Sequence, residues 1–217
     1  MKSLVQVLLR LLFYKAFGYA ISALVLGVRV TGREHLPKAG PAILIANHNS
    51  HLDTLVLGAL LPLKALRVLS PVAAGRYFLS NRYLAWFAIH VVGILPVGAG
   101  SGREAKQSLR RCSEAIENGR VLIFFPEGTR GTPEVPSRLK GGIAAIAELY
   151  PDVPMIPIRL FGLGHSLPKG GAIPLPLTCQ VRVGAPIRWT GSKQAYMHSV
   201  SIGLGSTETE PVAHIEV

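Results

Sequence analysis

Apolar runs alternate with short polar breaks along most of the 217-residue chain, and the runs are of two kinds. The first is short, β-branched and apolar at nearly every position, which is typical of strands buried on both faces. It occurs at 42–46, 67–74, 91–97, 120–125, 155–160 and 179–183. The second is longer and has helical spacing, at 53–60, 103–118 and 140–149. This alternation predicts an α/β fold: a single domain with a mostly parallel central sheet flanked by helices.

Residues 1–30 have a pattern of their own. Polar side chains occupy one third of a helical wheel and leucine and valine the rest, which indicates an amphipathic helix lying in a membrane surface. Lys15 and Gly18 interrupt this pattern, and the 13 uncharged residues at 16–28 fall short of the roughly 20 that span a bilayer. We therefore expect membrane-associating helices in residues 1–30. A pair of ordinary core helices is the alternative, and Arg10 and Lys15 disfavour a secretory signal.

The remaining sequence predicts one domain at 31–190 and a poorly ordered tail at 191–217, where apolar periodicity fades. The longest uncharged run, 83–102, has 20 residues and the length of a membrane span. It contains several glycines and Pro96, so a helix, a turn and a strand are the better interpretation.

Composition points to lipid or to a large apolar ligand. Only 16% of the residues are charged and 49% are hydrophobic, while the net charge is +11. A basic surface suits an anionic membrane or a phosphate-bearing substrate. Nucleic acid is disfavoured, because the basic residues do not cluster with aromatic ones. We expect a membrane-associated protein, monotopic or peripheral, on the cytoplasmic face. The two cysteines fit buried thiols in a reducing compartment, with neither a disulfide framework nor a zinc site.

A polar stretch, Asn-His-Asn-Ser-His-Leu-Asp, interrupts the apolar sequence directly after the strand at 42–46. Within it, His48 could act as a general base if Asp53, in the first turn of the next helix, folds back to orient it. The chain has no GxSxG nucleophile signature, so the proton would come from a hydroxyl of the substrate. Asp53 could instead only cap its helix. A metal site from His48, His51 and Asp53 is a further alternative.

A second polar loop, Phe-Pro-Glu-Gly-Thr-Arg at 125–130, follows the strand at 120–125. It brings together a carboxylate, a glycine, a hydroxyl and a guanidinium, from Glu127, Gly128, Thr129 and Arg130. Glycine lets backbone amides approach a ligand, and arginine offers a forked cation suited to phosphate. A turn with a local Glu–Arg ion pair is the simpler alternative.

The two stretches together resemble the 1-acylglycerol-3-phosphate acyltransferase family. Its NHxSxxD motif matches 47–53, and its FPEGTR motif is complete at 125–130. Lys140-Gly141-Gly142 and the proline-containing apolar strand at 153–158 match further family features. Order and spacing agree over about residues 29–187.

The resemblance implies an enzyme that moves a fatty acyl group from acyl-CoA or acyl-carrier protein to the free hydroxyl of a lysophospholipid, giving phosphatidic acid without a metal or cofactor. His48 would deprotonate the hydroxyl, Asp53 would orient His48, and the loop at 127–130 would hold the glycerol phosphate. Other acceptors (another lysophospholipid, glycerol 3-phosphate, an aminolipid) stay open. So do an interfacial lipid or thioester hydrolase and a catalytically silent binder of anionic lipid.

One motif departs from the family pattern. The family places a phosphate-binding arginine shortly after a glycine that corresponds to Gly93, and the expected position falls near Ala99. Arg103, in the first turn after the glycine-rich GAGSG loop at 98–102, is the candidate to replace it, aided by the backbone amides of a helix N-terminus. The GAGSG loop lacks the further glycine and the acidic partner of a dinucleotide site.

Overall fold

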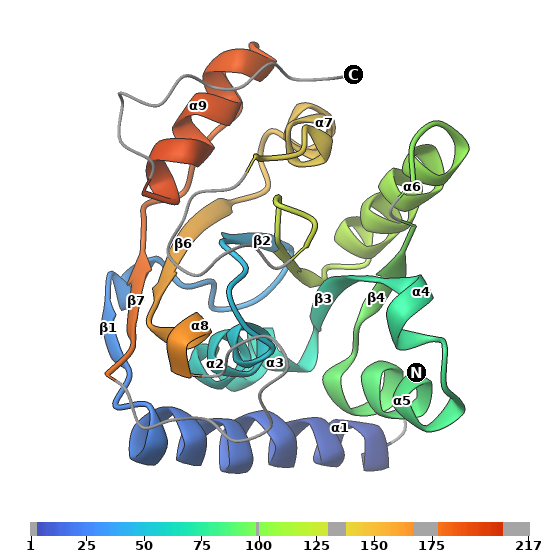
Figure 1. Ribbon diagram of the computed structural model, residues 1–217. Helices are drawn as coiled ribbons and strands as arrows, with labels where there is room; N and C mark the ends of the chain where they lie inside the picture. Colours follow the sequence, from blue (N-terminus) through green and yellow to red (C-terminus); the bar gives the residue numbers. More distant parts are fainter. Residues whose placement is uncertain (1–3, 99, 130–137, 167–177, 206–217) are drawn as a thin grey trace.

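The structure is a computed structural model, and it describes residues 4–98, 100–129, 138–166 and 178–205 (Figure 1). A seven-stranded sheet has the order β1-β7-β6-β2-β5-β3-β4. All neighbouring strands are parallel except β6 and β7, which are antiparallel. The strands are β1 (Arg29–Thr31), β2 (Ala42–Ala46), β3 (Leu69–Ala74), β4 (Leu95–Val97), β5 (Val121–Phe124), β6 (Met155–Phe161) and β7 (Gln180–Val183). The predicted fold class is therefore confirmed.

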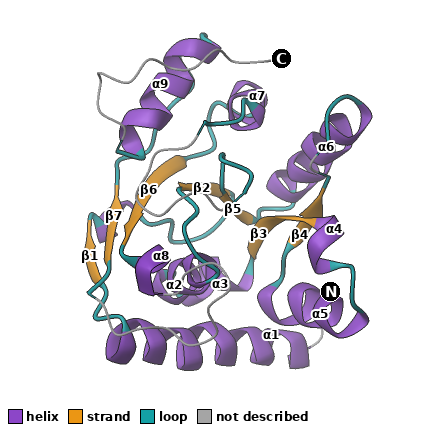
Figure 2. Ribbon diagram, in the orientation of Figure 1, coloured by secondary structure: helices purple, strands orange, loops and turns teal. Residues whose placement is uncertain are grey.

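Helices cover both faces of the sheet (Figure 2). One face carries a helix at the N-terminus together with α2 (Leu52–Leu60) and α3 (Leu63–Arg67). The other carries α6 (Arg103–Glu117), α7 (Gly142–Leu149) and α9 (Lys193–Gly203). The shorter elements are η3 (Arg33–His35), α4 (Gly75–Phe78), α5 (Arg82–Phe87), η4 (Ala88–Val92) and α8 (Leu163–Ser166).

The two faces bury separate apolar clusters, which the pleat of the central strand divides. Leu44 of β2 packs with the N-terminal helix and α2, whereas its neighbours Ile43 and Ile45 pack with α6, α7 and α9. All five residues of β2 are buried. A strand that is apolar on both faces needs a cover on each, which is why its sequence shows no alternation.

The predicted interruption of the N-terminal helix is wrong. Helical structure runs without a break from Leu4 to Val25 through α1 (Leu4–Leu11), η1 (Leu12–Gly18) and η2 (Ile21–Val25). Gly18 is buried, and a Cβ there would lie only 3.1 Å from Leu55 Cδ1 of α2. The glycine thus permits close helix packing instead of ending the helix. By length and composition alone, these 22 residues could cross a membrane.

The polar third of this N-terminal helix faces the protein. Arg10 is 3% exposed and Tyr14 is fully buried, while Leu4, Leu8 and Leu24 project outward. Arg10 Nη1 donates to the carbonyl of Leu69 at 2.6 Å, which places the arginine at the amino end of β3. The helix therefore presents its apolar face to the surroundings.

Two further expectations are corrected. The predicted strand at 91–97 begins only at Leu95, because residues up to Val92 stay in η4 and Gly93 turns the chain at a φ of 80°. The tail predicted to be poorly ordered from residue 191 contains α9, which buries Tyr196, Met197 and Val200 against the sheet. Residues 206–217 lie outside the described part of the chain.

Candidate active site

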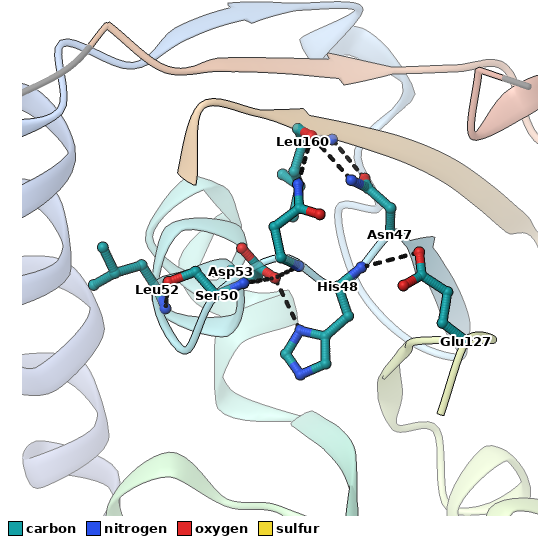
Figure 3. A network of polar contacts seen from close by, with 8 residues as sticks. Asn47, His48, Ser50, Leu52, Asp53, Glu127 and Leu160 are labelled. Atoms are coloured by element: carbon teal, nitrogen blue, oxygen red, sulfur yellow. Dashed lines mark hydrogen bonds and ion pairs between the residues drawn. The ribbon is translucent and has the colours of Figure 1, made fainter. Parts of the chain in front are cut away.

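The strand register places the two polar loops side by side. Ile45 of β2 pairs with Phe124 of the parallel neighbour β5. His48 and Glu127 each follow three residues after these paired positions. Carboxyl ends of parallel strands lie on one edge of a sheet, which is where α/β proteins place their sites. The main-chain N–H of His48 donates to Glu127 Oε1 at 3.4 Å across this junction (Figure 3).

Asp53 is the buried residue that holds the His48 loop in place. It is fully buried in the first turn of α2, and its Oδ2 accepts the backbone amides of Asn49 at 2.7 Å and Ser50 at 2.8 Å. The same oxygen lies 2.9 Å from His48 Nδ1 (Figure 3). The N-cap residue of α2 is His51, so Asp53 does more than cap its helix. It ties the preceding loop into one conformation and holds the imidazole.

His48 is oriented for proton transfer. A carboxylate only accepts hydrogen bonds, so the bond to Asp53 places the imidazole proton on Nδ1 and leaves Nε2 as the basic nitrogen. The side chain is 20% exposed, and the ring stacks on Phe125 with centroids 4.2 Å apart and planes 22° apart. These two contacts fix the ring, while Nε2 lies on the side of the ring away from Asp53 (Figure 3). This is the geometry of a general base.

Two asparagines brace the loop against β6. Asn47 Nδ2 donates to the carbonyl of Leu160 at 2.9 Å, and its Oδ1 accepts the amide of the same residue at 2.7 Å. Asn49 Nδ2 adds a third bond, to the Leu160 carbonyl, at 3.2 Å. These side chains imitate a strand pair and hold the loop where β2 has already ended. The sequence motif contains both asparagines, but it gave no sign of which strand they would bind.

The Glu127–Gly128 turn forms the other wall of the site. Gly128 has a φ of +76°, and its amide donates to the carbonyl of Phe125 at 3.0 Å. A Cβ at Gly128 would lie 2.6 Å from Lys140 Nζ, so the ammonium group rests directly on the glycine. The amide of Lys140 also donates to the Pro126 carbonyl at 2.8 Å. The structure thereby identifies Lys140 as a site cation, which the sequence motif alone could not place.

The other predicted residues of this loop, Thr129 and Arg130, are not both described by the structure. Thr129 is exposed next to Gly128 in the same loop, whereas Arg130 lies outside the described residues. Among the residues that the structure describes, no group of three or more His, Cys, Asp or Glu side chains could hold a metal ion.

Arg103 is the exposed first residue of α6, and it stays a prediction. The loop before it already binds a carboxylate of its own chain: Gly100 N donates to Glu104 Oε2 at 2.9 Å. Gly98 N donates to Ser108 Oγ at 3.0 Å. These contacts use amides that would otherwise serve a phosphate at the helix N-terminus. The expected arginine position, Ala99, lies outside the described part of the chain.

Known proteins share both the sequence and the fold. The family model described as "Acyltransferase" matches residues 27–160. A chloroplastic 1-acyl-sn-glycerol-3-phosphate acyltransferase of Arabidopsis thaliana is 31% identical over 66% of this chain and 38% of its own length. The 1-acyl-sn-glycerol-3-phosphate acyltransferase of Pseudomonas aeruginosa is 27% identical over 81% of this chain and 65% of its own.

The crystal structure of the 1-acyl-sn-glycerophosphate acyltransferase PlsC from Thermotoga maritima superimposes with a TM-score of 0.66 and 23% identity. The match covers 87% of this chain and 76% of that one, which shows the shared fold. The chain spans about two fifths of the length of the plant and algal relatives. With the family model covering well over half of its residues, the chain belongs to the acyltransferase family.

Proposed function

We propose that this chain is an O-acyltransferase that moves a fatty acyl group from an acyl thioester to the free hydroxyl of 1-acylglycerol 3-phosphate, giving phosphatidic acid. The observation that carries the proposal is the 2.9 Å contact between His48 and Asp53 beside the Glu127–Gly128 turn. The names of the relatives support the choice of acceptor.

In the proposed reaction, His48 Nε2 removes the proton of the acceptor hydroxyl as its oxygen attacks the thioester carbonyl carbon. The carbon–sulfur bond breaks when the tetrahedral intermediate collapses, and the imidazolium returns the proton to the leaving thiolate. Asp53, buried beside Nδ1, stabilises the imidazolium between these two steps. No protein nucleophile takes part, so the acyl group passes directly from thiol to hydroxyl.

Two cations would hold the acceptor phosphate: Lys140 over Gly128, and Arg130 from the same loop. We expect Lys140→Met to raise the KM for a phosphate-bearing acceptor by about tenfold with little change in the KM of the donor. Lys193→Met, at an exposed position of α9, is the matched control.

An acceptor panel tests the assignment. Lysophosphatidic acid, lysophosphatidylcholine, glycerol 3-phosphate and water are compared as acceptors, each with acyl-CoA and with acyl-carrier protein as donor. The highest kcat/KM for lysophosphatidic acid would support the proposal. The donor that gives the higher kcat/KM, acyl-CoA or acyl-carrier protein, is then the thioester that the enzyme uses. Release of free fatty acid without any acceptor, at the rate of acyl transfer to lysophosphatidic acid, would show that the enzyme is a hydrolase and contradict the proposal.

We propose further that the N-terminal helix lies in the plane of the membrane, on its cytoplasmic face. Its outward side carries exposed Leu4, Leu8 and Leu12, and its inward side contributes Tyr14 to the core. Because Tyr14 is part of the core, deletion of the helix would damage the fold. A Leu4→Gln/Leu8→Gln/Leu12→Gln variant is the better test. It should weaken sedimentation with anionic vesicles, while the single exposed change Leu149→Gln on α7 should not.

A further inference from the structure

A second apolar surface lies outside the N-terminal helix. Among the described residues, sixteen large hydrophobic side chains are exposed, and six of them fall in a stretch of thirteen residues on α4, α5 and η4. We call these six the aromatic surface: Tyr77, Leu79, Tyr83, Trp86, Phe87 and Ile89. Soluble surfaces seldom gather apolar side chains so densely without a partner.

The aromatic surface is continuous with the outward face of the N-terminal helix. Phe13 stands between them: its ring contacts Phe87 edge-on at 5.4 Å and stacks with Phe17 at 6.2 Å. Phe17 and Phe87 are both exposed. Figure 1 shows α5 beside the first turns of α1, and Gln6 Nε2 of α1 lies 2.7 Å from His90 Nδ1 of η4, which directly follows α5. A partner that covers the outward face of the N-terminal helix therefore also reaches the aromatic surface.

At its other end, the aromatic surface reaches the candidate active site. Helix α4 begins directly after β3, on the edge of the sheet that carries the His48 loop. The Tyr77 ring stacks with that of His51 at 6.3 Å, and His51 belongs to the same loop as His48. The segment 75–92 thus runs from the site edge to the N-terminal helix, with exposed apolar side chains along its length.

The chemistry of this segment favours an anionic bilayer over a second protein surface. Residues 75–92 contain Arg76 and Arg82 and no Asp or Glu. The Arg82 guanidinium lies 5.2 Å from the centre of the Tyr83 ring. Tryptophan and tyrosine with flanking arginine are typical of the boundary between lipid headgroups and acyl chains. The positive charge of the segment matches anionic headgroups.

We propose that the aromatic surface is a second membrane contact, which enters the headgroup region of an anionic bilayer beside the N-terminal helix and turns the His48 loop toward the lipid. The proposal rests on the proposed function only in that the acceptor is a membrane lipid. It assigns membrane contact to a segment that the sequence pattern placed inside the domain.

The two tryptophans of the chain provide the test. Trp86 lies on the aromatic surface and is 52% exposed, whereas Trp189 packs against Tyr196 of α9 with ring centroids 5.6 Å apart. In Figure 1, α9 and α5 lie at opposite ends of the molecule. Full-length W189F and W86F variants therefore each keep one reporter, on opposite sides. Both are mixed with vesicles of phosphatidylcholine and phosphatidylglycerol that carry bromine at shallow or deep acyl positions.

The expected result is a blue shift of Trp86 emission on adding vesicles and quenching by shallow bromine, with Trp189 emission unchanged. A second pair of variants measures the contribution to binding. Tyr83→Gln/Trp86→Gln should weaken vesicle partitioning by about 70-fold, because roughly 100 Å² of apolar surface leaves the lipid. Ile202→Gln, at a position on α9 that is 44% exposed, should partition as the wild type does.

Unshifted, unquenched Trp86 in a chain that sediments with vesicles would overturn the proposal, as would a failure to bind vesicles at all. A blue shift that needs only higher protein concentration, without lipid, would assign the surface to a second copy of the chain instead. Acyl transfer to lysophosphatidic acid in detergent micelles is measured on the same variants. It separates the two proposals, since an unshifted, unquenched Trp86 with retained transfer overturns only the membrane surface.

Discussion

Buried polar side chains gather at both ends of the sheet, with different consequences. At the carboxyl edge, Asp53 binds the Nδ1 proton of His48 and leaves Nε2 of the imidazole without a partner in the loop. At the amino edge, donors from the N-terminal helix end on main-chain carbonyls. Arg10 donates to Leu69, Tyr14 to Val92 at 3.1 Å, and Lys15 Nζ to the end of α2.

The comparison shows what a buried polar group is for in this fold. At the amino edge Arg10, Tyr14 and Lys15 each donate to a main-chain carbonyl, so these side chains contribute to docking of the helix. At the carboxyl edge the chain fixes an acid–base pair and leaves one basic nitrogen for an outside molecule. Changes at the amino edge should alter stability with little effect on chemistry, and changes at the carboxyl edge should do the reverse.

The largest effect should come from Asp53→Asn. The neutral amide cannot stabilise an imidazolium as the carboxylate does, so kcat should fall by about 10²-fold to 10⁴-fold. Thermal unfolding followed by circular dichroism should show that the fold survives. Glu117→Gln is the control, because Glu117 also accepts a hydrogen bond, from Tyr150 at 2.6 Å, on the exposed surface. More than a tenth of wild-type kcat in Asp53→Asn would break the distinction between the edges.

A smaller effect should come from Gly58→Ala in α2. The new Cβ would lie 2.2 Å from Tyr14 Cδ1, so the N-terminal helix must shift, at a cost of about 1–3 kcal/mol in the free energy of unfolding. Denaturant titration measures this loss. Gly142→Ala is the helical control, since its nearest contact would be an ordinary 3.8 Å to Phe124 Cζ. Equal stability of the two variants would mean that α2 and the N-terminal helix do not pack closely.

Lys15→Met should cost less, about 1 kcal/mol, because it removes the donor to the carbonyls of Ala59 and Leu61 but keeps an aliphatic stem. Its kcat per folded molecule should equal that of the wild type. Chemical denaturation and a kinetic assay on the same preparation give both values. A tenfold drop in kcat without loss of stability would place Lys15 in the chemistry and contradict the comparison.

The smallest effect concerns a buried group at neither edge. Burial raises the pKa of Cys112 to about 11, so the thiol stays protonated at pH 8. Peptide mapping after iodoacetamide treatment should find Cys112 unmodified in the native chain and modified in guanidinium chloride. Because the folded pKa is raised, the stability that this thiol contributes is complete below its unfolded pKa near 9 and is lost as the pH rises toward 11. Rapid labelling of Cys112 in the native chain would show that burial does not protect this thiol from iodoacetamide.

The sequence predicted the fold class and placed a polar loop directly after each of two strands, because both follow from local patterns. Apolar runs located the strands, and His48 and Glu127 had to share an edge once their strands were parallel neighbours. What failed depended on tertiary packing. Gly18 resembles a helix breaker until Leu55 is seen against it. The weakly periodic α9 is held by the burial of Tyr196 and Val200.

The position of Lys140 also lay beyond the sequence. Its ammonium rests on Gly128 only because the chain returns to the loop after residues 130–137, which the structure does not describe. Spacing along the sequence carries no information on such a return. The same holds for Asn47 and Asn49, whose partner Leu160 is more than 100 residues away.

The central claim is that His48 is the base that activates the acceptor hydroxyl. Single-turnover transfer from acyl-CoA to lysophosphatidic acid by His48→Ala tests it most directly, with His198→Ala, at an exposed position of α9, as the control. The account expects His48→Ala to be slower by at least about 10²-fold with unchanged thermal unfolding, and His198→Ala to match the wild type. Transfer by His48→Ala at near the wild-type rate would contradict it.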